Sequence, residues 1–151
     1  MNNSLLEYLA EKQVAGQWRG FLAALAPVLL ARLGLAEVRA LMHAAGEQFA
    51  AEHSLPACRN LDELELAISK VWVDANWGWV MLEEAEDSLR MRHFCAPLAV
   101  AFNDPELAWS GAFLEGAYQV WLSAVGAGPA LRVRQLAVAD DGLSLSLELR
   151  R

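Results

Sequence analysis

Three histidines, His43, His53 and His93, have the side chains best suited to acid–base or metal chemistry in this sequence. A metal site would need a second histidine, a cysteine or a carboxylate at a recognised ligand spacing, and none of the three has that arrangement. His43 lies four residues before Glu47, which is the spacing of a solvated pair on one helix face. The histidines therefore predict no metal site.

The remaining reactive residue types also lack a catalytic pattern. Cys58 and Cys95 match neither a zinc knuckle nor a disulfide framework, so we interpret them as small buried hydrophobic residues. Acidic residues gather over 62–65 and 83–87, where a helix start and a turn favour them, and we interpret both segments as solvated faces. No nucleophile elbow, phosphate-binding glycine loop or dinucleotide fingerprint is present. The sequence predicts no catalytic residue and no cofactor. An enzyme would be indicated only if His93 lay in an open polar pocket with a carboxylate within hydrogen-bond reach.

Six tryptophans among 151 residues are more than packing usually requires. Indole rings fill cores and interfaces, and they also stack on sugars. Trp77 and Trp79 share one face of a predicted strand, while Trp109, Tyr118 and Trp121 lie on a predicted helix. We interpret these five residues as candidates for an assembly or partner interface, with core packing and sugar stacking as the alternatives.

Helical patterns occupy the first half of the chain. Four helices are predicted, over residues 4–16, 17–33, 35–53 and 60–75. Ser4 and Asn60 are each followed three residues later by glutamate, which is the spacing of a capping box. Pro27 predicts that the second helix is kinked or divided, because proline removes a donor and crowds the preceding turn. Gly34 predicts a stop or a bend.

After Asn76 the apolar period changes from that of a helix to that of a strand. Two β-hairpins are predicted, over 77–94 and 131–149, and the second turns at residues 140–142. Asp104, Pro105 and Glu106 have the residue types of a helix start, which predicts a helix from 104 to 126 between the hairpins.

These elements predict an α+β fold. The chain is expected to form a single domain over residues 1–151, with 1–75 mainly helical and 76–151 forming two hairpins joined by a helix. The hairpins predict a four-stranded antiparallel sheet, β-β-α-β-β in order, packed against helices on one face. Gly116 in the joining helix predicts a close backbone approach to the sheet or to a second helix.

Charge and apolar patterns in the sequence indicate the expected partners and cellular location of the protein. A formal net charge of −7 offers no basic footprint for a phosphate backbone, so nucleic acid is an unexpected partner. The N-terminus lacks the features of a secretory signal. Arg19 and Arg32 bound the most apolar stretch, which predicts no transmembrane segment. We therefore expect a cytoplasmic protein.

A series of short motifs occurs along the chain. They are Trp77-Gly78, Asp87-Ser88-Leu89-Arg90, His93, Pro97, Trp109, Phe113-Leu114-Glu115-Gly116, Tyr118, Trp121 and Gly126, with weaker signals at Glu37-Val38-Arg39, Cys58 and residues 62–66. In order and spacing these motifs resemble the D subunit family of bacterial cellulose synthase. The resemblance covers about residues 35–138 and does not include the first 34 residues.

This resemblance implies a non-catalytic accessory or scaffold subunit of the cellulose-secretion complex, with a role in biofilm cellulose. It implies a homo-oligomeric ring built from dimers, an octamer, that helps to organise synthase complexes and to export and align β-1,4-glucan chains. The implied partners are copies of the same chain, other synthase subunits, a proline-rich accessory protein and glucan chains. Family members have been placed in the periplasm or beneath the inner membrane, and the expected absence of a signal favours the cytoplasmic side. The resemblance assigns no glucan-binding residue.

A second hypothesis comes from another class of protein. A β-β-α-β-β order with a glycine in the joining helix is also similar to small-ligand sensor domains of the vinyl-reductase and haem–nitric-oxide-binding type. Such a domain would hold a hydrophobic ligand between helices and sheet. The cysteine and glycine signature of that class before the last strand is absent here.

Overall fold

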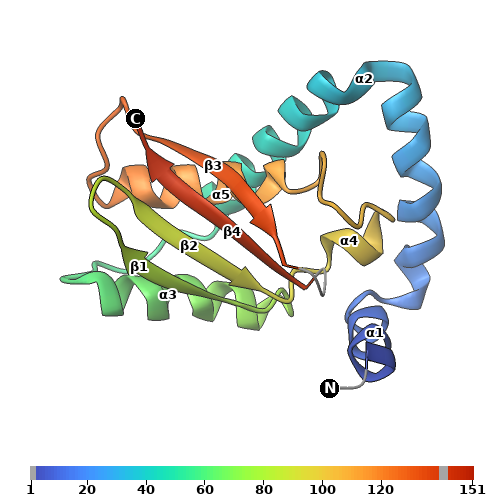
Figure 1. The fold of residues 1–151 in the computed structure, drawn as a ribbon, viewed down its shortest axis with the longest axis horizontal. Coiled ribbons are helices and arrows are strands. Elements are labelled where there is room, and N and C mark those ends of the chain that lie inside the picture. The colour runs from blue at the N-terminus through green and yellow to red at the C-terminus, as the bar shows by residue number, and fades with distance from the viewer. Residues whose placement is uncertain (1–2, 140–142) are drawn as a thin grey trace.

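The computed structural model of the chain describes residues 3–139 and 143–151 as an α+β fold (Figure 1). Its helices are α1 (Asn3–Gln13), α2 (Gly16–Glu52), α3 (Leu61–Asp74), α4 (Leu98–Ala101) and α5 (Ala112–Ala124), and its strands are β1 (Trp79–Glu84), β2 (Leu89–Phe94), β3 (Arg132–Val138) and β4 (Ser144–Arg150). The predicted fold class and the order of helices before two joined hairpins are confirmed. The short helix α4 is an addition, and the turn predicted at 140–142 lies outside the described residues.

The four strands form one antiparallel sheet in the order β1-β2-β4-β3. One face, here called the inner face, carries the buried positions of each strand, among them Val80, Met91, Val133 and Leu147. Alternation along the strands produces this face, because successive side chains point to opposite sides. The opposite side, here called the outer face, is turned toward the viewer in Figure 1, and α5 lies behind the strands.

Helices α5 and α2 cross in close contact, and each has a glycine at the crossing point. A Cβ atom built on Gly46 would lie 1.9 Å from the carbonyl oxygen of Phe113, and one built on Gly116 would lie 2.0 Å from that of His43. Both neighbours are backbone atoms that cannot move without displacing a helix. The close approach predicted for Gly116 is confirmed, and its partner is a second helix rather than the sheet.

Side chains of the helices close both edges of the sheet. On β1, Ser69 accepts from the amide of Val80 and donates to its carbonyl, and a Glu65 oxygen accepts from the amide of Leu82 at 2.7 Å. On β3, Gln119 and Glu115 of α5 accept from the amides of Val133 and Gln135. An edge strand whose polar groups are satisfied in this way is a poor template for another strand.

The helical backbone angles of α2 are interrupted at Gly34 and not at Pro27. Gly34 has φ 79° and ψ 166°, a conformation that side chains rarely allow, whereas Pro27 keeps helical backbone angles. The predicted division of the helix at Pro27 is therefore wrong, and the predicted bend at Gly34 is confirmed. We call residues 3–33, that is α1 and the part of α2 before this bend, the arm; it forms the blue right-hand side of Figure 1.

The helix predicted from residue 104 begins only at Ala112. Asp104 is buried, and its carboxylate accepts from the amides of Ala108, Trp109 and Ser110 and from the Ser110 hydroxyl at 2.8 Å. This residue closes a turn-rich loop instead of capping a helix. Trp109 consequently lies in that loop and not on the helix that joins the hairpins.

Candidate interaction surfaces

Three of the five aromatic residues predicted at an interface are inside the protomer. Tyr118 has no exposed surface, and the side chains of Trp109 and Trp121 are buried as well. A side chain enclosed by its own chain cannot touch a partner directly. The interface prediction can therefore apply only to Trp79, which is 44% exposed, and in part to Trp77, which is half-buried.

Tyr118 and Trp121 belong to an aromatic cluster between the helices and the sheet, whereas Trp109 packs separately against Phe102. Phe49 of α2 stacks on Trp72 of α3, with centroids 5.3 Å apart and planes 3° from parallel. Trp121 meets Trp72 edge to face at 5.2 Å, and Trp77 stacks on it at 5.6 Å. A sensor domain would hold its ligand between helices and sheet, and these rings lie in that region. The sequence did not predict Trp72 for this role.

His93 lies within this cluster and is fully buried. Its Nε2 is 2.7 Å from the Trp77 carbonyl, which can only accept, so Nε2 carries the proton. Nδ1 therefore accepts from the Tyr118 hydroxyl at 2.7 Å, and the Tyr118 oxygen accepts from Nε1 of Trp72 at 3.0 Å. Every polar group in this chain of bonds is satisfied when the imidazole is neutral.

Burial disfavours the charged form of His93 and lowers its pKa to about 4, although the bond to Trp77 opposes this shift. Burial likewise raises the pKa of Tyr118. Both ring nitrogens of His93 already have partners, and neither partner is a carboxylate. The condition that would indicate an enzyme is therefore not met at this residue.

The other candidate residues lie in ordinary surface or packing positions. His43 pairs with Glu47 at 3.0 Å on the surface of α2, as predicted. Cys58 and Cys95 are half-buried, where the sequence predicted buried residues. The acidic segment 83–87 forms the exposed end of the first hairpin. Across residues 3–139 and 143–151, no three His, Cys, Asp or Glu side chains are grouped to hold a metal ion.

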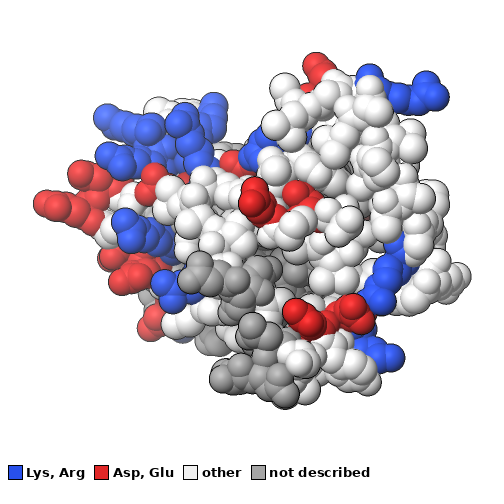
Figure 2. Space-filling view, turned by 45° about the vertical axis from the view of Figure 1, so that its right-hand side comes forward, with Lys and Arg blue, Asp and Glu red and all other residues white. Residues whose placement is uncertain are grey.

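The arm presents a large apolar surface that the sequence did not assign to a site. Trp18 and Phe21, one turn apart on α2, are 55% and 56% exposed, and their rings meet at 6.0 Å. Among the residues of the arm whose burial is described, the other exposed large apolar ones are Leu5, Tyr8, Leu9, Val28 and Leu33. Figure 2 shows that the right-hand side of the molecule carries few charges. An apolar helix stretch with almost no polar face could have revealed this surface, because such helices are normally covered.

By length and composition, α2 is also apolar enough to cross a membrane, the one such helix in the described part of the chain. This differs from the sequence prediction, because the helix continues beyond Arg32 and through the bend. However, the arm is attached to the rest of the protein. Ala26 is only 3% exposed, and the Gln13 amide donates to the carbonyls of Asn76 and Cys95.

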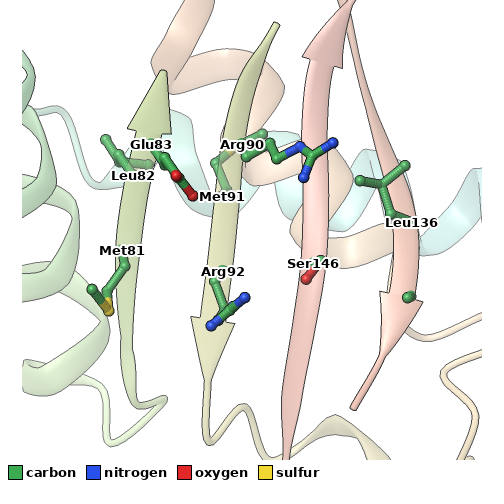
Figure 3. Close-up of a pocket in the computed structure, with 9 residues that line it drawn as sticks. Met81, Leu82, Glu83, Arg90, Met91, Arg92, Leu136 and Ser146 are labelled. Atoms are coloured by element: carbon green, nitrogen blue, oxygen red, sulfur yellow. The ribbon is translucent and has the colours of Figure 1, made fainter. Parts of the chain in front are cut away.

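The outer face of the sheet is a second exposed surface. Trp79 of β1 stacks on Phe94 of β2 at 5.3 Å, at one end of this face. Beside them lies an open groove of about 570 Å³ that spans the four strands. Figure 3 shows its lining residues, including Met81, Arg92 and Leu136. Trp79 and Trp77 thus belong to different surroundings, because Trp77 precedes β1 and packs inside the aromatic cluster.

Comparison with known proteins gives one consistent result. The family model for the D subunit of cellulose synthase matches residues 4–148. Proteins named cellulose synthase operon protein D, from Komagataeibacter xylinus and Komagataeibacter sucrofermentans, are each 26% identical over 105 residues, which make up 68% of this chain and 67% of each relative. A further Komagataeibacter xylinus protein of that name is 30% identical over 70 residues, 45% of each chain. The family match begins within α1, so it includes the arm, which the resemblance by motifs did not reach.

Proposed function

This chain belongs to the family of the cellulose synthase D subunit, and from that premise we propose that it is a non-catalytic scaffold that works by assembling with its own copies. Family membership gives it a role in cellulose synthesis. In the proposed role it forms a ring of dimers, an octamer, on the cytoplasmic side of the inner-membrane synthase. The ring organises synthase complexes and assists the export and alignment of glucan chains.

The observation that carries this proposal is the exposed apolar surface of the arm. A stable obligate interface commonly buries more than about 2,000 Å² and is rich in apolar and aromatic residues. The arm offers Trp18, Phe21 and Val28 along α2, with Leu5 and Leu9 on α1. Contact between arms of neighbouring copies would remove this surface from water.

A lipid bilayer is a less suitable cover for the same surface. The exposed apolar residues continue onto α1, whose 11 residues are too few to span a bilayer. Inserting α2 would also separate Ala26 from its packing and break the bonds of Gln13. We therefore propose that copies of the chain, and not lipids, cover the arm.

A ring gives the protein many copies of each weak binding surface. Multivalency of this kind raises apparent affinity by about 10²–10⁴ without a catalytic group. Other synthase subunits, a proline-rich accessory protein and glucan chains are the proposed partners of the assembled ring.

Charge placed in the arm should prevent assembly. We expect the double variant Trp18→Asp, Phe21→Asp to form particles of lower mass than the wild type, because carboxylates resist burial in an apolar interface. Circular dichroism should still show a folded protein, since both side chains are more than half exposed. Light scattering on chromatographic fractions measures the mass. Leu66→Asp on α3, a residue that is 70% exposed, is the matched control.

Wild-type mass in the arm variant, or dissociation caused only by Leu66→Asp, would contradict the proposed interface. The biological role is tested in the bacterium that carries this gene. Deletion should lower cellulose yield and disorder the fibrils, and the arm variant should fail to restore them. Normal cellulose in the deletion strain would contradict the proposed function.

A further inference from the structure

Arginines concentrate on the outer face of an otherwise acidic protein. The outward positions of the strands hold Arg90, Arg92, Arg132, Arg134 and Arg150, together with Glu83 and Glu148. Five arginines and two glutamates give this face a charge of +3, in a chain whose net charge is −7. Figure 2 shows a group of blue residues in the upper left, on the side of the molecule away from the arm.

The register orders these charges in rows across the sheet. Glu83, Arg90, Glu148 and Arg134 lie directly opposite one another on β1, β2, β4 and β3, so the sign alternates across all four strands. Within the described residues, the guanidinium groups of Arg90, Arg92, Arg134 and Arg150 form no hydrogen bond or ion pair. Each therefore keeps its five N–H donors for another molecule.

Apolar side chains lie beside these arginines. Met81 and Leu136 are 54% and 47% exposed, and both line the groove with Arg90 and Arg92. Leu136 is exposed here because the register shifts between Gln135 and Ala137, which leaves an extra residue on β3. The groove thus combines free cationic groups with apolar contact surface.

From these observations we propose that the outer face binds an acidic segment of a partner protein, one in which carboxylates alternate with apolar side chains. Arg90 and Arg92 lie two residues apart on one strand, a separation of about 7 Å, which matches alternate side chains of an extended peptide. The carboxylates would pair with Arg90, Arg92 and Arg134, and an apolar side chain would contact Met81 and Leu136.

Two features favour such a peptide over other ligands. The interleaved Glu83 and Glu148 would repel a continuous polyanion, such as nucleic acid or an anionic membrane, at every second position of the row. Amides on both sheet edges already donate to side chains of α3 and α5, which disfavours the addition of a partner strand. The side chains of the outer face are therefore the proposed contact surface.

The probe for this surface is a fluorescein-labelled peptide of alternating glutamate and leucine, titrated into the purified full-length protein and followed by anisotropy. We expect saturable binding that weakens as salt rises from about 50 to 300 mM, because screening reduces the attraction of exposed charges. The double variant Arg92→Glu, Arg134→Glu should bind roughly tenfold more weakly. Lys70→Glu, a single charge reversal on the exposed surface of α3, is the control and should bind like the wild type.

Three results would overturn the proposal: no saturable binding by the wild type, equal affinity of the double variant, or equal affinity for a peptide of alternating lysine and leucine. If the double variant formed smaller oligomers than the wild type, the outer face would be a contact between copies of the chain. That result would also overturn the proposal. The readouts use purified protein, so they are independent of whether the chain acts in cellulose export.

Discussion

Alanine at Gly46 or Gly116 is expected to lower the free energy of unfolding by about 3 kcal/mol or more, which is the upper range for overpacking a core. The added methyl group would lie 1.9 or 2.0 Å from a carbonyl oxygen of the facing helix. Neither helix can move away alone, because α5 also packs against the sheet and α2 carries the arm. Urea denaturation at a fixed protein concentration measures the change.

Gly20→Ala provides the matched control for this helix crossing. Gly20 also lies in α2, but a Cβ built there meets no atom within 4 Å. Alanine should stabilise α2 at this position by up to about 1 kcal/mol, because it restricts the unfolded chain and favours the helix. Equal stabilities of the Gly20, Gly46 and Gly116 variants would show that the helices are not in such close contact.

Acidic pH is expected to lower the free energy of unfolding because His93 is buried in its neutral form. Its pKa is lowered from 6.5 to about 4 by burial, so between these pH values the unfolded chain binds a proton that the folded chain excludes. The contribution of neutral His93 is complete above about pH 6.5 and declines as pH falls toward 4, by on the order of 3 kcal/mol in total. Urea denaturation at several pH values measures this decline.

Comparison of two variants isolates the contribution of His93 from that of the carboxylates. His93→Gln should be less stable at neutral pH but should lose less stability between pH 6.5 and 4, because it takes up no proton. His43→Gln, on the surface of α2, is the control for replacing a histidine outside the aromatic cluster. Parallel pH profiles for wild type and His93→Gln would contradict the assignment of a neutral, buried imidazole.

Local patterns predicted most of the fold because they agree with the tertiary structure at those positions. The capping spacing at Asn60 is an example: its side chain accepts from the Glu63 amide at 2.9 Å and α3 begins at the next residue. After Asn76 the apolar residues change from helical spacing to alternation, and this change correctly predicted β1. The alternation reflects one buried and one exposed face of the strand. The α+β class and the antiparallel sheet follow from such patterns.

The remaining errors arose where distant contacts decide the structure. Asp104 and Pro105 are residue types that typically start a helix. The carboxylate of Asp104 instead accepts hydrogen bonds from the amide and hydroxyl of Ser110 in the loop. The bend of α2 depends on a backbone conformation that Gly34 can adopt, while Pro27 remains within a continuous helix.

Aromatic content alone could not separate the interior from the interaction surfaces. Trp121 and Trp79 looked equivalent in the sequence, but the first is buried beside Trp72 and the second lies on the outer face. The arm was not predicted as a site because its residues form no motif. The apolar composition of its helix was a signal in the sequence, but the folded structure was needed to show that these side chains are exposed.

The mass of the purified full-length chain in detergent-free buffer tests the central claim most directly. Light scattering coupled to size-exclusion chromatography should give a single species whose mass is an even multiple of 16.6 kDa, and eight copies are predicted. Such a species would indicate that copies of the chain cover the arm. A stable 16.6 kDa protomer in the same buffer, with the arm in water, would contradict the account.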